Sequence, residues 1–141
     1  MAGENIVVID TLADAGGSDA LKLYGSDEYI SWSEVLTKRI VIDMTLTKAP
    51  GYNYLFDNRN SVGGASRIYH TDYNTWFVGA GLTLLVNGVS KANGSTVDTF
   101  DQNAVYEIIL DNPQPTSTLF CNKTFCKITL PKWCIIFVQA V

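Results

Sequence analysis

The sequence predicts an all-β domain of antiparallel strands, arranged as a two-sheet β-sandwich or a barrel, and three observations support this. The chain is 47% hydrophobic and only 17% charged, and it is rich in Thr, Val, Ile and Tyr, which suit a half-buried sheet surface. Short apolar runs recur about every eight to twelve residues, with turn residues between them. No long segment has the helical period, which excludes βαβ units. A chain of 141 residues fits a single domain, 1–141, with one core.

The first elements are short. The β-branched run Ile6–Ile9 lies within residues 1–20, an N-terminal strand or arm that can pair with a neighbouring chain. Leu21–Tyr24 and Glu28–Trp32 follow as short strands. Ser33–Lys38 is compatible with one helical turn capped by its serine, although a helix this short is not stable alone.

The clearest strand is Arg39–Thr47. Its apolar residues at even positions, from Ile40 to Leu46, share one face, and the odd positions, which include Asp43, share the other. This period of two predicts a strand with one buried side and one wetter side.

The later strands are separated by clear turn residues. Asn87-Gly88 predicts a tight hairpin of the primed type, because both residues accept positive φ, and a second Asn-Gly at 93–94 turns the chain again. The other strands are expected at Tyr52–Phe56, Ser66–His70, Thr75–Val78, Leu82–Val86, Val89–Lys91, Val105–Leu110, Leu119–Phe120, Thr124–Leu130 and Trp133–Val138.

Four segments occur in an order typical of one family. They are LKLYGSDEYISW (21–32), IVIDMTLTKAPGYNYLF (40–56), LTLLVNGVSKANGSTV (82–97) and VYEIIL (105–110). Over most of its length the chain resembles the concanavalin A-like, laminin G-like jelly roll, which implies an antiparallel two-sheet sandwich. An immunoglobulin-like sandwich is the main alternative, but its Cys…Trp…Cys arrangement is missing.

Members of this family occur in glycan hydrolases, lectins, adhesion modules and bacteriophage fibres. The N-terminus has no secretory signal, so the resemblance implies a bacteriophage virion protein made in the host cytoplasm. One implied role is a non-enzymatic structural or decoration protein that binds the phage particle and other virion proteins. The alternative is a lectin-like module of a tail fibre or adhesin that binds a host-surface glycan.

Several other classes are disfavoured. The net charge is −4 and no basic run exceeds Lys38-Arg39, so nucleic acid is not an expected partner. No apolar stretch is long enough to insert into a membrane. The alternating carboxylates of glycosidases on this fold are absent, and His70, the only histidine, is expected in a polar edge or loop setting. The chain is therefore not expected to be an enzyme.

Two short segments carry candidate sites. Asp57, Asn58 and Asn60 offer the oxygen ligands that Ca²⁺ prefers, although such residues also form Asx turns, and no other cofactor is expected. The segment 67–76 mixes aromatic and hydrogen-bonding side chains, which suits core packing, a protein contact or a glycan. Its candidate binding residues are Arg67, Tyr69, Asp72, Tyr73, Asn74 and Trp76.

The last strand, Trp133–Val138, is apolar on both faces, and its Trp133 and Phe137 are expected in the core. One face must pack on the opposite sheet, and a neighbouring subunit would cover the other, so a homo-oligomer is expected. The chain has three cysteines, Cys121, Cys126 and Cys134, and reduced thiols are expected, with a Cys121–Cys126 bridge as the alternative.

Overall fold

The computed structural model describes residues 5–10, 21–23, 30–48, 51–58, 67–71, 73–119, 127–130 and 135–141. Within these ranges the chain is all-β, and no helix long and apolar enough to span a membrane occurs there. The strands are β1 (Asn5–Asp10), β2 (Leu21–Leu23), β3 (Ile30–Thr47), β4 (Tyr52–Asp57), β5 (Arg67–Thr71), β6 (Trp76–Val78), β7 (Leu82–Val86), β8 (Val89–Lys91), β9 (Asn103–Leu119), β10 (Lys127–Leu130) and β11 (Ile135–Ala140).

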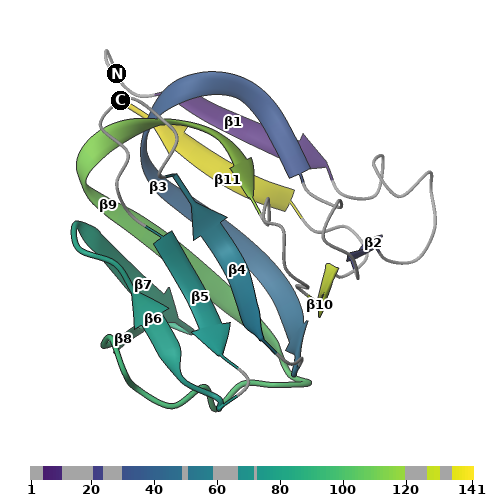
Figure 1. Ribbon diagram of the computed structural model, residues 1–141. Helices are drawn as coiled ribbons and strands as arrows, with labels where there is room; N and C mark the ends of the chain where they lie inside the picture. The colour runs from purple at the N-terminus through teal and green to yellow at the C-terminus, as the bar shows by residue number, and fades with distance from the viewer. Residues whose placement is uncertain are drawn as a thin grey trace.

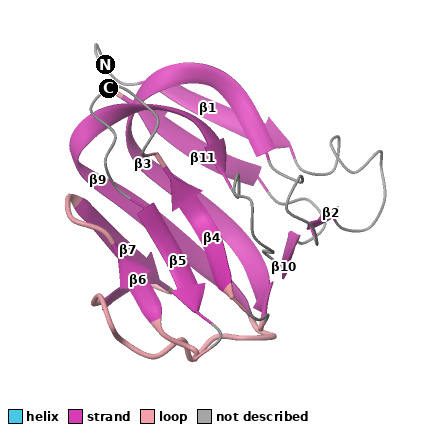
Figure 2. Cartoon of the chain, in the orientation of Figure 1, coloured by secondary structure: helices cyan, strands magenta, loops and turns pink. Residues whose placement is uncertain are grey.

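These strands form two antiparallel sheets, as Figures 1 and 2 show. The large sheet has the order β1-β11-β3-β9-β7-β8, and β10 joins it beside β3 and also pairs with β2. The small sheet has the order β4-β5-β6 and lies in front of β3, β9 and β7 in Figure 1. The predicted two-sheet β-sandwich is therefore confirmed.

A single apolar core fills the space between the sheets. The predicted alternation in β3 places Ile40, Ile42, Met44 and Leu46 on the inner face, where all four are fully buried. They belong to one cluster with side chains of the small sheet, among them Leu55, Phe56, Ile68 and Trp76. Burying each such side chain contributes about 1.5–3 kcal/mol to the free energy of folding, so this core holds the two sheets together.

Residues 33–38 do not form the helical turn that the sequence allowed. They continue β3 as a strand, which joins the segments predicted separately as Glu28–Trp32 and Arg39–Thr47. The cause is non-local pairing: Thr37 lies opposite Gln114 of β9, and its hydroxyl is 2.6 Å from that of Thr116. An isolated helical turn has no comparable partners and is not stable by itself.

Strand β9 also runs further than the predicted Val105–Leu110 and contains Pro113 and Pro115. Proline is tolerated where a strand has an open edge, because it lacks an N–H to donate. Pairing with β7 ends at Leu110. Pro113 lies in an irregularity of the pairing with β3, between Ile109 and Gln114, and Pro115 lies opposite Leu36 beyond the part of β9 that pairs with β7.

The termini of the described chain lie at one end of the sheet order. Residues 5–10 form β1, which pairs with β11 of the same chain. The rest of the predicted N-terminal arm lies outside the described residues, as do Trp133, Cys121, Cys126 and Cys134.

The hairpin between β7 and β8 has the predicted tight turn. Asn87 has a φ of 50° and Gly88 a φ of 80°, and Val86 pairs with Val89. The Asn87 side chain fixes the turn to β9, because its Oδ1 accepts a hydrogen bond from the Val105 N–H at 2.9 Å.

We expect Gly88→Ala to destabilise the domain by about 1 kcal/mol, because a Cβ is disfavoured at positive φ. The loss should lower Tm by about 3 °C for a domain of this size. Ser90→Ala, two residues away on an exposed strand, is the control and should leave Tm unchanged. An unaltered Tm in Gly88→Ala would show that the turn does not need positive φ.

Candidate functional site

The fold divides the predicted binding segment 67–76 between two faces of the small sheet. Arg67 and Tyr69 lie on the outer face of β5, away from the core. Trp76 points inward and is only 1% exposed, so it is part of the core. Tyr73 and Asn74 lie in the turn between β5 and β6, where Tyr73 is 84% exposed. Asp72 lies outside the described residues.

Aromatic rings from all three strands meet on the outer face of the small sheet. We call this set, Tyr52, Tyr54, Tyr69 and Phe77, the aromatic row. Tyr69 is central: its ring centroid lies 4.7 Å from that of Phe77 with nearly parallel planes, 4.8 Å from that of Tyr54 and 5.3 Å from that of Tyr52. Neighbouring strands place these residues side by side, because Tyr54, Tyr69 and Phe77 are register partners.

The inner rings of this row cover one another. Tyr54 and Tyr69 are buried, whereas Tyr52 is 54% exposed. Because Tyr69 and Phe77 face each other across the strands, the faces between them are occupied. Phe77 belongs to β6, the last strand of the small sheet, so its other face is not covered by a further strand of that sheet. The two rings in the middle of the row, Tyr54 and Tyr69, are therefore largely covered, whereas the rings at its ends, Tyr52 and Phe77, are more open to solvent.

Arg67 lies against this row. Its guanidinium carbon is 5.1 Å from the Phe77 centroid, 5.3 Å from that of Tyr69 and 6.0 Å from that of Tyr54. One guanidinium nitrogen donates a hydrogen bond to the Tyr54 hydroxyl at 3.1 Å. Within the part of the chain that the structure describes, Arg67 makes no ion pair, whereas Arg39 and Lys91 pair with Glu107 and Asp98.

Sequence reasoning identified Arg67 and Tyr69 but missed Tyr52, Tyr54 and Phe77. The alternation in Tyr52–Phe56 places Tyr52 and Tyr54 on one face, and this signal was available. The meeting of that face with Tyr69 and Phe77 required the register across three strands, which includes an irregularity between Tyr54 and Phe56. No local pattern specifies such a register.

His70 occupies the opposite, inner face. The expected polar edge or loop setting is wrong, because β5 is the central strand of the small sheet and the side chain is 0% exposed. Its ring centroid lies 5.0 Å from that of Phe100 and 5.9 Å from that of Trp76. The alternation with Ile68 would have predicted this inward position.

Burial lowers the pKa of His70 to about 4, because the imidazolium loses its hydration. The backbone of Thr71 opposes this shift only in part. Neither ring nitrogen makes a hydrogen bond of good geometry. A neutral, enclosed imidazole does not reach a substrate in solvent, so His70 is a structural residue of the core.

The predicted calcium ligands are only partly described. Asp57 ends β4, and the neighbouring Asn58 is buried with its amide donating a hydrogen bond to Gln114 Oε1 at 3.0 Å. This contact ties β4 to β9, which is a structural task. Asn60 lies outside the described residues, and the described ones contain no cluster of three His, Cys, Asp or Glu side chains suited to a metal. Calcium binding stays a prediction.

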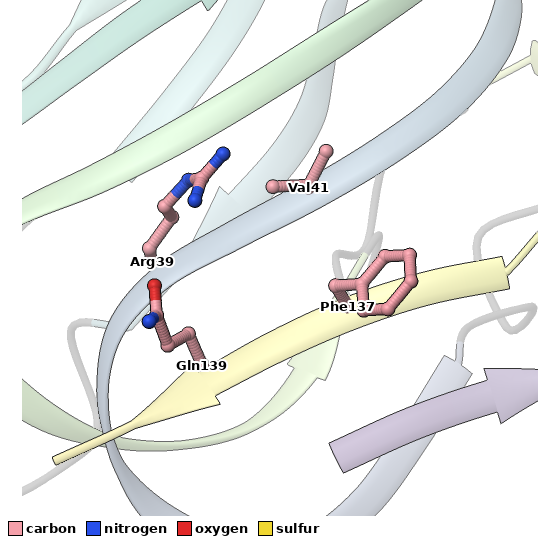
Figure 3. A pocket seen from close by; sticks show the side chains of 4 residues that line it. All are labelled: Arg39, Val41, Phe137 and Gln139. Carbon is pink, nitrogen blue, oxygen red and sulfur yellow. The ribbon is translucent and has the colours of Figure 1, made fainter. Parts of the chain in front are cut away.

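A second candidate surface is the outer face of the large sheet. Figure 3 shows a depression there, lined by Arg39 and Val41 of β3 and by Phe137 and Gln139 of β11. Its volume is about 340 Å³, and an adjoining depression of about 350 Å³ reaches Ile109 and Pro113. Phe137 is 42% exposed although it lies on a strand flanked by β1 and β3. The apolar residue is therefore exposed on a sheet face and not at an edge.

The charged groups of this second face are already paired. Arg39 contacts Glu107 at 3.1 Å, and the Asn103 amide donates to Asp43 at 2.6 Å. Both candidate surfaces are suited to binding. One combines aromatic rings with Arg67, which has no ion-pair partner among the described residues, and the other combines apolar side chains with charged groups that have partners. Comparisons of the chain with models of protein families, with curated proteins and with solved structures found no match.

Proposed function

We propose that this chain is a non-enzymatic assembly module that docks through the outer face of the large sheet onto a second copy of itself. The observation that carries the proposal is Phe137, an exposed aromatic ring in the middle of a sheet face. We define the docking face by the apolar side chains that share this side of β3, β7, β9 and β11: Val41, Leu85, Val105, Ile109 and Phe137.

The register places these apolar side chains in neighbouring rows around the Arg39–Glu107 ion pair. Phe137 lies opposite Val41, which lies opposite Glu107, which in turn lies opposite Leu85. Ile109 lies opposite Arg39 in the next row. Removing such side chains from water favours association by roughly 25 cal/mol per Å² of apolar area. The translational and rotational freedom that the two copies lose on association opposes this gain.

The charges of the docking face permit a like partner there, despite the overall repulsion between copies. The chain carries a net charge of −4, so two copies repel each other over most approaches. On the docking face Arg39 and Glu107 compensate each other, so a partner does not strand an unpaired charge there. A two-fold contact would place Phe137 of one copy in the depression beside Val41 and Gln139 of the other, since closed dimers use the same patch twice.

The resemblance of the sequence to virion jelly rolls supplies the setting of the proposal, a structural or decoration role on a bacteriophage particle. Decoration of a particle needs many copies of a small, stable domain, and a sandwich with one adhesive face suits that task. Peptide mass spectrometry of purified bacteriophage particles tests whether the chain is a component of the virion. Detection of the chain in particles is expected, and its consistent absence from them would exclude this role.

We expect Phe137→Ser to weaken self-association by at least about tenfold, as for other buried aromatic anchors. Sedimentation velocity over a range of protein concentrations measures the effect. Val89→Ser is the matched control, because Val89 is 58% exposed on the β7–β8 hairpin, opposite inward-facing Val86. A wild-type chain that stays monomeric at every concentration, or a Phe137→Ser variant that associates like wild type, would contradict the proposal.

A further inference from the structure

We infer that Arg67 and the aromatic row bind a carboxylate-bearing oligosaccharide, with Arg67 holding the carboxylate and the exposed rings contacting the sugar. This site lies on the small sheet, on the opposite outer face from the docking face. It is therefore independent of the self-association proposed above.

The charge of the ligand follows from Arg67. Asp57 lies opposite Arg67 in the register of β4 and β5, but no ion pair joins the two side chains. The described contacts of the guanidinium are a phenol hydroxyl and three aromatic rings. The faces of aromatic rings attract a cation through their quadrupole but carry no net charge, so the row does not neutralise Arg67. Arginine presents several N–H donors in a planar fork that matches a carboxylate in a bidentate contact.

The apolar and hydroxyl-binding part of the ligand follows from the rings. Tyr52 is 54% exposed, and Tyr73 in the adjoining turn is 84% exposed. Exposed aromatic surface suits the C–H face of a sugar, and phenol hydroxyls both donate and accept hydrogen bonds. A saccharide combines these features with a carboxylate when it contains a uronic or sialic acid residue.

The length of the ligand follows from the register. Arg67 begins β5, and Thr71, the register partner of Tyr52, ends it. Four residues of strand span about 13 Å, which is longer than one sugar ring. One acidic residue at Arg67 therefore leaves room for further sugar units toward Tyr52 and Tyr73, and an oligosaccharide should bind more tightly than its monosaccharide.

Isothermal titration calorimetry tests the inference with two acidic probes, an oligogalacturonate and a sialyl-oligosaccharide, each beside a neutral oligosaccharide of equal length. We expect wild type to bind at least one acidic probe, and to bind it at least tenfold more tightly than its neutral counterpart. Because Phe137 lies on the opposite outer face, the Phe137→Ser variant should bind the same probe with unchanged affinity. This result would separate the saccharide site from the docking face.

The variants Arg67→Gln and Tyr52→Ala are expected to weaken binding, Arg67→Gln by at least tenfold. Lys48→Gln removes the same charge at an exposed position beyond the end of β3 and serves as the control. Circular dichroism and Tm confirm that each variant is folded. Equal affinity for acidic and neutral probes, undiminished binding by folded Arg67→Gln, or binding of an acidic peptide but of neither acidic saccharide would overturn the inference.

Discussion

Replacing Trp76 with alanine is expected to lower the free energy of unfolding by about 3–5 kcal/mol, the range for deleting a fully buried aromatic side chain. Trp76 is 1% exposed and packs near His70 and Tyr106, with ring centroids 5.9 Å and 6.3 Å away. Because domains are stable by only about 5–15 kcal/mol, this change removes a large part of the total. Chemical denaturation monitored by circular dichroism measures it.

Tyr73→Ala is the control for this prediction. Tyr73 lies three residues away in the same aromatic segment, but it is 84% exposed, so its removal should change stability by no more than about 0.5 kcal/mol. Together the two variants separate core packing from surface binding within one segment. A Trp76→Ala variant as stable as wild type would show that the indole does not fill the space between the sheets.

The second large effect is a loss of stability in acid that depends on His70. The folded chain holds the pKa of His70 at about 4, below its ordinary value of 6.5, because burial disfavours the charged ring. Between these values the unfolded chain binds a proton that the folded chain does not, so stability falls as the pH drops from 6.5 to 4. The loss of unfolding free energy that is due to His70 amounts to about 3 kcal/mol, and it is complete below pH 4.

Denaturation curves at pH 7 and pH 4 test this, with His70→Phe as the comparison variant. Carboxyl groups titrate in both proteins, so the informative quantity is the difference between their pH dependences. We expect wild type to lose about 3 kcal/mol more than His70→Phe over this interval. Identical losses in the two proteins would mean that the imidazole is hydrated in the folded state.

The strands that the sequence located correctly are those whose pattern is local. In β3 the alternation from Ile40 to Leu46 directly reflects one buried face, and Asn87-Gly88 has the backbone freedom that a tight hairpin requires. Residues 33–38 failed as a prediction because their partners in β9 lie about eighty residues away in sequence. A short window contains no information about such pairing.

For the candidate sites, too, the sequence predicted what depends on local pattern and missed what depends on non-local pairing. Arg67 and Tyr69 were identified from composition, but the aromatic row depends on the register of three strands, and composition alone could not separate Tyr69 on the outer face from Trp76 in the core. The apolar character of the last strand indicated that one of its faces would lie outside the core, but the expectation that Phe137 packs in the core is wrong, because this ring is 42% exposed on the outer face. Its neighbours Val41 and Ile109 come from other strands and required the fold.

The two proposed binding surfaces lie on opposite sides of one sandwich, so they can be occupied at the same time. Ile42, Trp76 and Tyr106 belong to the packed core between them. Because this core is close-packed, a ligand or partner on one outer face would not rearrange the other face. A copy engaged through Phe137 would still present Arg67 and Tyr52 to a ligand, and an assembly of such copies would bind an oligosaccharide multivalently.

Hydroxyl-radical footprinting at rising protein concentration tests the central claim most directly, because it reports the solvent access of individual side chains. We predict that Phe137 loses reactivity as copies associate, while Tyr52 and Tyr73 on the other side of the molecule stay fully reactive. Constant reactivity of Phe137 across the association range, or protection of Tyr52 and Tyr73 instead, would contradict the assignment of the docking face.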